Sequence, residues 1–148
     1  MSQPAATETD DRSLHPLAQL PGFALRRAAN AMMAELATAL APLDLKISDT
    51  ALLMLVQGRR DMTSSRIGEL LDIQRANMVP LLARLESAGL IERVPIDRRS
   101  SAIVLTAQGQ AQHDAALAII TRFEHDLLAR IAPEHRDHFL PALTNLVS

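Results

Sequence analysis

Arginines and polar side chains gather between residues 59 and 99, and their types suit contact with nucleic acid. Arginine can bind phosphate or guanine through two parallel hydrogen bonds, and asparagine can pair with adenine in the same manner. Arginine supplies nearly all of the positive charge, because Lys46 is the only lysine in the chain. The candidate contacts are Thr63, Ser64, Gln74, Arg75, Ala76, Asn77, Pro80, Arg84, Asp97, Arg98 and Arg99.

Acidic residues are interspersed among these arginines, which leaves a second interpretation open. A solvated helical face carries the same mixture of charges, so composition alone does not separate it from a nucleic-acid surface. The net charge of −2 argues against a protein that coats nucleic acid indiscriminately. The choice therefore depends on the elements that carry the arginines.

Two short helices are predicted in the centre of the chain. Thr63 can accept a hydrogen bond from the first turn of a helix, while Met62 packs on Ile67. After a polar break at residues 72–75, apolar residues return at helical spacing, and Gly89 can end this second helix in the left-handed conformation. The apolar positions are Met78, Leu81, Leu82 and Leu85. The pair predicts a helix-turn-helix whose second helix is the recognition helix.

A hairpin is predicted directly after these helices. Residues 90–94 and 102–105 are short β-prone runs, and residues 95–101 between them are too charged for a core position. Pro95 stiffens the approach to this basic tip. The order of helix, recognition helix and hairpin predicts a winged helix-turn-helix and favours the nucleic-acid interpretation of the arginines.

This segment resembles the MarR-type transcriptional regulators of bacteria. The matching residues are Leu85-Glu86, Gly89-Leu90-Ile91, Arg93, Asp97-Arg98-Arg99 and Leu105-Thr106-Ala107-Gln108-Gly109. The resemblance implies a homodimer that binds a pseudo-palindromic site on double-stranded DNA. It further implies that Arg99 enters the minor groove and that Asp97 holds this arginine through an ion pair.

The recognition helix departs from the usual pattern of such regulators. Relatives commonly carry serine or threonine where this chain has Ala76, Asn77, Val79 and Pro80. The target sequence therefore cannot be carried over from a relative. Pro80 removes one backbone hydrogen bond, although a position close to the helix start partly avoids that cost, and its ring could touch a thymine methyl group.

A mainly α fold with a small β-hairpin is expected over most of the chain. Its 148 residues and 48% hydrophobic content fit one globular domain. The resemblance implies that long helices on both sides of the winged helix-turn-helix build a dimer interface. The expected segments are a flexible tail at 1–12 and a single domain at 13–148, with the winged helix-turn-helix at 47–106 and dimerisation helices at 13–41 and 107–147.

The helices on both sides have recognisable limits. A long alanine-rich helix is predicted from Phe23 to Leu40, before Pro42, and Ser48 or Asp49 can cap the next, which ends near Gly58. Thr106 can cap a long amphipathic helix that ends before Pro133. A last helix is expected at residues 133–147, with a kink or a restart at Pro141.

Other chemistries find little support in the sequence. The chain has no cysteine, which excludes disulfides and thiol-based sensing, and it lacks a glycine-rich phosphate loop and a nucleophile elbow. We therefore expect no catalytic residue, no cofactor and no enzyme activity. The five histidines are interpreted as surface residues without a metal, although His135 and His138 lie one helical turn apart: they are His15, His113, His125, His135 and His138.

A small-molecule site is implied by the resemblance, since many MarR-type repressors release DNA when an aromatic or carboxylate-bearing compound binds. Methionine adapts to irregular apolar ligands and arginine pairs with carboxylates, although the same residues also serve as core filler or surface charge. The candidates are Arg26, Arg27, Met32, Met33 and Met54. The sequence does not identify the ligand.

The leading interpretation is a cytoplasmic, ligand-responsive repressor that does not contact membranes. The first residues lack the order of a secretory signal, and no apolar run is long enough to cross a bilayer. The alternative is a winged-helix module used only for protein contact, or one that compacts DNA without sequence choice. Competition binding at raised salt separates the two, because base contacts preserve a preference that non-specific binding lacks.

Overall fold

The computed structural model describes residues 16–148 and is mainly helical with one small hairpin. This arrangement confirms the expected fold class. The tail expected at residues 1–12 and the histidine at position 15 lie outside the described residues. Within residues 16–148, no helix combines the length and the apolar character needed to cross a membrane.

The described part of the chain divides into two compact units, residues 16–35 and 36–148. The first contains a 3₁₀ turn, η2 (Pro16–Gln19), and most of helix α1 (Pro21–Leu40). Helix α1 begins two residues before the predicted Phe23 and ends at the predicted Leu40. Its alanine-rich sequence explains the length, because alanine loses no side-chain entropy on entering a helix.

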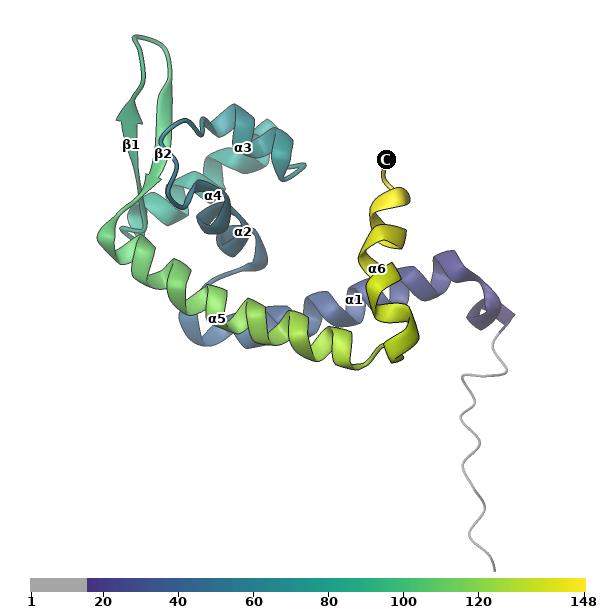
Figure 1. Cartoon of the computed structure of the whole chain (residues 1–148). Coiled ribbons are helices and arrows are strands. Elements are labelled where there is room, and N and C mark those ends of the chain that lie inside the picture. The colour runs from purple at the N-terminus through teal and green to yellow at the C-terminus, as the bar shows by residue number, and fades with distance from the viewer. Residues whose placement is uncertain (1–15) are drawn as a thin grey trace, which may run out of the picture. The chain divides into compact units, whose positions relative to one another are not determined.

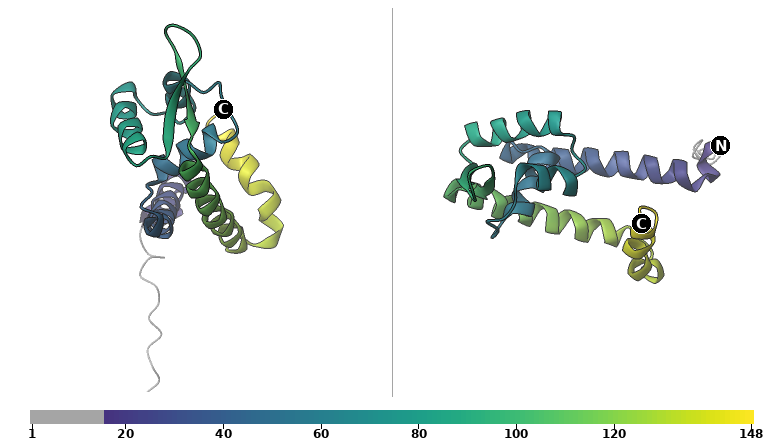
Figure 2. Two further views of the ribbon diagram at one scale, coloured as in Figure 1. Left: turned by 90° about the vertical axis from the view of Figure 1, so that its left-hand side faces the viewer. Right: turned by 90° about the horizontal axis from the view of Figure 1, so that it is seen from above.

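The second unit carries the remaining elements (Figure 1). In order these are η3 (Ala41–Leu43), α2 (Ile47–Val56), α3 (Ser64–Leu70), α4 (Arg75–Ser87), β1 (Ile91–Pro95), β2 (Ser101–Leu105), α5 (Ala107–Ala129) and α6 (Pro133–Asn145). Strands β1 and β2 pair antiparallel, with Arg93 opposite Ile103 at the centre. Figure 2 shows the hairpin projecting beyond α3 and α4, as a wing does.

Helices α3 and α5 begin at the predicted caps. The Thr63 hydroxyl accepts a hydrogen bond from Arg66 N–H at 3.3 Å, and the Thr106 hydroxyl accepts one from Gly109 N–H at 3.0 Å. Thr106 Oγ1 also donates to the Gly89 carbonyl at 2.6 Å, which joins the start of α5 to the end of α4. Two side chains therefore set both helix starts.

Helix α2 begins at Ile47, which is earlier than a cap at Ser48 or Asp49 would place its first residue. Lys46 occupies the N-cap position, and its backbone N–H donates to Asp49 Oδ2 at 2.7 Å. Asp49 therefore acts from the third helical position, where a carboxylate also interacts favourably with the helix dipole. The predicted capping by Asp49 is confirmed, although the N-cap position itself belongs to Lys46 and Asp49 lies three residues later.

Gly89 ends α4 as predicted, with φ of +72°. Gly89 N–H donates to the Glu86 carbonyl at 2.9 Å, and Leu90 N–H donates to the Leu85 carbonyl at 3.0 Å. This is the Schellman arrangement, and the buried Leu90 supplies its apolar contact. The chain then enters β1 in a fixed direction.

Two prolines lie inside helices without ending them. Pro80 is the sixth residue of α4, so its missing N–H would have bonded the Ala76 carbonyl, and the cost is not avoided by closeness to the helix start. Pro141 lies within α6, which continues to Asn145. The helix therefore does not restart at Pro141, and the alternative, a kink at this residue, stays a prediction.

The core of the second unit joins α2, α3, α4, the hairpin and the first part of α5. Its fully buried side chains include Leu52, Leu53, Met62, Ile67, Leu82, Leu85 and Ile103. Ile103 N–H donates to the Met62 carbonyl at 2.8 Å, so the segment that leads into α3 pairs with strand β2 of the wing. The helix-turn-helix and the hairpin therefore form one rigid support for the exposed side chains.

Candidate nucleic-acid interface

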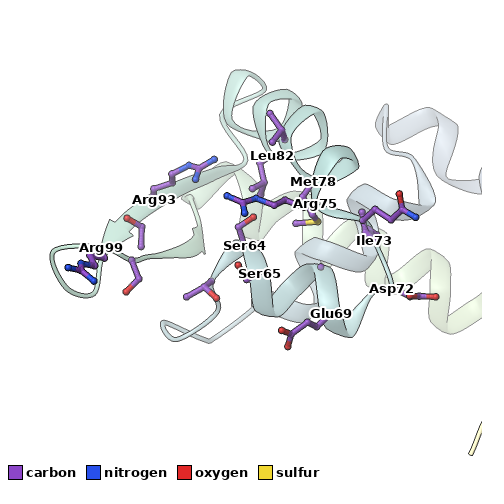
Figure 3. Close-up of a pocket in the computed structure, with 16 residues that line it drawn as sticks. Ser64, Ser65, Glu69, Asp72, Ile73, Arg75, Met78, Leu82, Arg93 and Arg99 are labelled. Carbon is purple, nitrogen blue, oxygen red and sulfur yellow. The ribbon is translucent and has the colours of Figure 1, made fainter.

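A groove of about 740 Å³ lies between the start of α3, the start of α4 and the hairpin (Figure 3). The predicted residues that line it are Thr63, Ser64, Gln74, Arg75 and Arg99. Hydroxyl groups of Ser65, Ser100 and Ser101, which sequence reasoning missed, lie in the same wall. Three separate elements thus bring donors for phosphate and base edges into one concave surface.

The arginines around this groove fall into two groups. Arg93 Nε pairs with Glu86 Oε1 at 2.5 Å, and Arg66 Nη1 pairs with Glu69 Oε2 at 3.1 Å. Within residues 16–148, Arg75 and Arg99 have no carboxylate partner. Their guanidinium groups can therefore bind an external anion without first breaking an ion pair.

The tip of the wing is held by Asp97 acting on the backbone. Asp97 Oδ1 accepts hydrogen bonds from Arg99 N–H at 2.7 Å and from Ser100 N–H at 2.9 Å. These bonds, the one from Arg99 first, hold the pKa of Asp97 below its usual range. The carboxylate therefore stays ionised at neutral pH, and its hold on the turn is lost only as strong acid protonates it.

The implied ion pair between Asp97 and the Arg99 side chain is not found among the described residues. The side chain of Asp97 is short enough to reach N–H groups two and three residues ahead, which is the usual Asx turn. Asp97 thus fixes the path of the tip and leaves the Arg99 guanidinium unpaired at the position labelled in Figure 3.

The other predicted contacts lie outside the groove. Ala76, Asn77 and Pro80 are exposed on α4, and Arg98 is exposed at the tip of the wing. Arg84 pairs instead with the carboxylate of Asp49, which is only 2% exposed. This ion pair lies beside a second groove of about 590 Å³ at the start of α2.

Sequence reasoning missed the pair between Asp49 and Arg84. The two residues are separated by 35 positions, and neither lies in a motif that predicts the other. Asp49 also accepts the hydrogen bond from Lys46 N–H, so one buried carboxylate caps α2 and ties it to α4. The only available signal was Asp49 itself, an acid at the predicted start of a helix.

The residues expected to hold a small molecule are divided between the two units. Arg26 and Arg27 are exposed on α1, Met32 is half-buried and Met33 is 54% exposed. Met54 is half-buried in α2 of the second unit. Their grouping into one site stays a prediction.

The four histidines in the described part of the chain form no cluster with other ligand types. Among residues 16–148, no group of three or more histidine, cysteine, aspartate or glutamate side chains could hold a metal ion. His113 is buried in α5, so its interpretation as a surface residue is wrong, and its Nδ1 lies 2.8 Å from Asp114 Oδ1. His125, His135 and His138 are exposed.

Known proteins share both the sequence pattern and the fold. A family model described as a winged helix DNA-binding domain matches residues 45–109. The transcriptional repressor CouR, solved on a 23-mer DNA duplex, is 31% identical, with a TM-score of 0.82 over 89% of this chain and 95% of CouR. CouR was also solved with p-coumaroyl-CoA, at 27% identity and a TM-score of 0.78 over 96% and 98% of the two chains.

Two further relatives come from named bacteria. The MarR family protein Rv2887 of Mycobacterium tuberculosis, solved with salicylic acid, is 28% identical, with a TM-score of 0.67 over 85% of this chain and 95% of Rv2887. The transcriptional regulator HosA of Escherichia coli O111:H- is 29% identical over 76 residues. That match covers 50% of this chain and 56% of HosA.

Proposed function

The chain belongs to the MarR family of transcriptional regulators, and we propose that it is a homodimeric repressor that binds a pseudo-palindromic site on double-stranded DNA. In this proposal a small molecule releases the protein from its operator. The relatives with printed functions are DNA-binding regulators and repressors, which supports a role on cytoplasmic DNA without catalysis.

The observation that carries the proposal is the groove between α3, α4 and the wing. Arg75 and Arg99 line it without carboxylate partners among the described residues, and serine hydroxyls lie between them. Charge-assisted bonds to phosphate need cations and donors in this arrangement. If all of these arginines were in ion pairs with acidic side chains, the same surface would bind DNA more weakly.

The shapes of the elements suggest how DNA is placed. Helix α4 is exposed on the face opposite its buried residues, and an α-helix fits the major groove. The hairpin is thin and ends in Arg98 and Arg99, which suits a narrow minor groove with its concentrated negative potential. We propose that Thr63 and Ser64 bind phosphate, that Arg75 and Asn77 contact bases, and that Arg99 enters the minor groove.

The effector is proposed to carry a carboxylate and an aromatic or extended apolar part. Rv2887 was solved with salicylic acid and CouR with p-coumaroyl-CoA. In this chain Arg26, Arg27, Met32, Met33 and Met54 are the residues proposed to bind such a compound. Anisotropy of the DNA complex during titration with salicylate tests this part alone, and unchanged affinity at millimolar salicylate would exclude that compound as an effector.

Selection of bound DNA from a random pool tests the whole proposal. We expect a two-fold symmetric motif whose half-sites are separated by about one helical turn. Competition at raised salt provides the second arm, because counterion release weakens all phosphate contacts while base contacts keep the preference. A pool that stays random, with binding lost at moderate salt, would instead indicate DNA compaction, and no binding at all would indicate a protein-contact module.

A further inference from the structure

The outward face of α4 carries small side chains that have almost no hydrogen-bonding groups. Ala76, Pro80, Ala83 and Ser87 follow one another at intervals of four, three and four residues, and all are exposed. The buried residues of α4, Met78, Leu81, Leu82 and Leu85, occupy the opposite face. Ala76, Val79, Pro80 and Ala83 are called the apolar line below.

Val79 extends the apolar line towards the wing. Its side chain is 66% exposed, and it lines the groove together with Arg75, which lies one turn earlier on α4. Hydrogen-bonding side chains suited to base edges lie at the start of the helix, at the N-cap Gln74, at Arg75 and at Asn77. The later Arg84 and Glu86 are held in ion pairs with Asp49 and Arg93. Beyond that turn, the central surface of α4 offers carbon atoms.

Pro80 makes this arrangement costly for the isolated protein. Its position in the interior of α4 removes the hydrogen bond to the Ala76 carbonyl, and proline weakens helices in such positions. The ring is exposed, so it does not repay that loss by packing in the core. A contact made only in the DNA complex would give the ring a favourable environment.

An apolar surface on a helix can favour one base pair over another, because it can cover a methyl group but cannot form hydrogen bonds with polar base edges. In the major groove, the thymine methyl is the apolar group, whereas guanine and cytosine present only acceptors and donors. Burying those polar groups against carbon atoms removes their water without a replacement hydrogen bond. Small side chains also let the helix backbone approach the base edges closely.

We propose that Val79 and Pro80 read thymine methyl groups in each half-site, next to bases that Gln74, Arg75 and Asn77 read by hydrogen bonds. The inference rests on the proposed DNA-binding function and specifies which chemical group its recognition helix selects. It predicts a thymine in the middle of each half-site that no hydrogen bond from the protein would explain.

Replacement of thymine by deoxyuridine tests the inference directly, because it removes only the methyl group. Each thymine of the selected operator is replaced in turn, and affinity is measured by fluorescence anisotropy with wild-type protein. We expect about fourfold weaker binding at one or two positions per half-site, which is the value of one buried carbon group. In an operator variant with cytosine at such a position, 5-methylcytosine should recover about the same factor.

Protein variants identify the side chains that make the contact. In Val79→Thr, a hydroxyl replaces one methyl while the branched shape is kept, and Pro80→Ala removes the ring. Both positions are exposed, so neither change disturbs the core. We expect each variant to lower the ratio of thymine to deoxyuridine affinity at its own position, because less carbon surface faces the methyl group. Arg98→Ala, on the wing, should keep the wild-type ratio.

Two results would overturn the inference while leaving the proposed function intact. One is a selected symmetric operator in which every deoxyuridine replacement changes affinity by less than about 1.5-fold, well below the value of one buried methyl. The other is a thymine preference that survives unchanged in both Val79→Thr and Pro80→Ala. A chain that selects no DNA would overturn the proposed function and this inference together.

Discussion

At the scale of single residues, Asp97 and Arg99 have separate roles at the tip of the wing. Asp97 holds two backbone N–H groups, and the Arg99 guanidinium has no acid partner among the described residues. The motif indicated an acid and an arginine at these two positions. It did not predict that Asp97 would bind backbone N–H groups and not the arginine side chain. Turn geometry decides whether a carboxylate binds the backbone or a neighbouring side chain, and the sequence does not specify that geometry.

This geometry predicts different results for two substitutions of Asp97. Asparagine keeps an oxygen at the position that accepts from Arg99 and Ser100, so Asp97→Asn should keep operator affinity within about twofold. Asp97→Ala removes the acceptor, loosens the tip and should weaken binding by about three- to tenfold. Fluorescence anisotropy at physiological salt measures both. Equal losses in the two variants would indicate that the charge matters and the backbone bonds do not.

Arg99→Ala should weaken operator binding by about tenfold or more, because an extended guanidinium in the minor groove gains from the concentrated potential. Its exposed position means that thermal stability and dimerisation should be unchanged. Arg98→Ala removes the same charge one residue earlier on the exposed tip, and it should weaken binding less than Arg99→Ala, because Arg99 lines the groove and Arg98 does not. Equal affinity of wild type and Arg99→Ala would remove the wing from the mechanism.

Asn77 and Arg75 should govern base preference at different positions of each half-site. A good bidentate contact discriminates by about 1–3 kcal/mol, so Asn77→Ala should relax the preference for one adenine and Arg75→Ala that for one guanine. Repeating the random-pool selection with each variant shows the change as one flattened position in the motif. An unchanged motif in both variants would indicate that Gln74 and the apolar line, and not Arg75 and Asn77, determine the base preference.

At the scale of elements, most helix limits were readable because local hydrogen bonds set them. Thr63 and Thr106 cap α3 and α5, and Gly89 ends α4, as their residue types predict. The start of α2 was harder, because Lys46 has no capping side chain and Asp49 acts from three residues inside. Long-range ties such as Asp49 with Arg84 depend on how α2 and α4 pack, which local signals do not report.

Removal of Arg84 should destabilise the protein without changing its phosphate contacts. Arg84→Ala leaves the buried Asp49 carboxylate without its cation, at a cost of about 1–3 kcal/mol after allowance for the partly exposed guanidinium. Urea unfolding should show a lower midpoint with an unchanged slope. The salt dependence of DNA affinity should also be unchanged, whereas an arginine bound to phosphate would reduce that slope by about one.

A double-mutant cycle separates the two roles of Asp49. Asp49→Ala loses the bond to Lys46 N–H as well as the pair with Arg84, so it should cost more than Arg84→Ala. The Asp49→Ala/Arg84→Ala double variant should be less destabilised than the sum of the two single variants. Strict additivity would mean that the ion pair contributes nothing.

The glycine of the Leu-Thr-x-x-Gly motif is explained by how closely α5 approaches the turn after α4. A Cβ atom at Gly109 would lie 1.9 Å from the Leu90 carbonyl oxygen. Gly109→Ala should therefore force α5 away from the hairpin and cost at least about 1–3 kcal/mol of unfolding free energy. Gly22→Ala in α1 is the control, because its Cβ would meet nothing within 4 Å and should be neutral or stabilising.

At the scale of the whole molecule, the single chain leaves many large apolar side chains exposed on its long helices. They include Leu25 and Met33 on α1, Leu117 and Leu128 on α5, and Leu140 on α6. Helical periodicity predicted these helices but could not show which apolar residues stay uncovered, because burial depends on packing between distant elements. Uncovered apolar surface of this kind indicates a partner, and a second copy is the proposed one.

We therefore expect a dimer at micromolar concentration in sedimentation experiments, and Leu140 offers a sharp test of it. Leu140 is 70% exposed on α6, so Leu140→Lys should place a charge in the dimer interface without disturbing the monomer core. The variant should sediment as a monomer with an unchanged helical circular dichroism spectrum. His138→Lys, an exposed change on another face of α6, should remain dimeric.

Monomerisation should affect DNA binding more strongly than the loss of any single contact. A dimer places two recognition helices on half-sites one helical turn apart, so the second half-site is bound at a high effective concentration. Leu140→Lys should therefore lose about 100-fold or more in operator affinity while its preference for one isolated half-site stays the same. A monomeric variant with full operator affinity would separate DNA recognition from dimerisation and contradict the proposed symmetry.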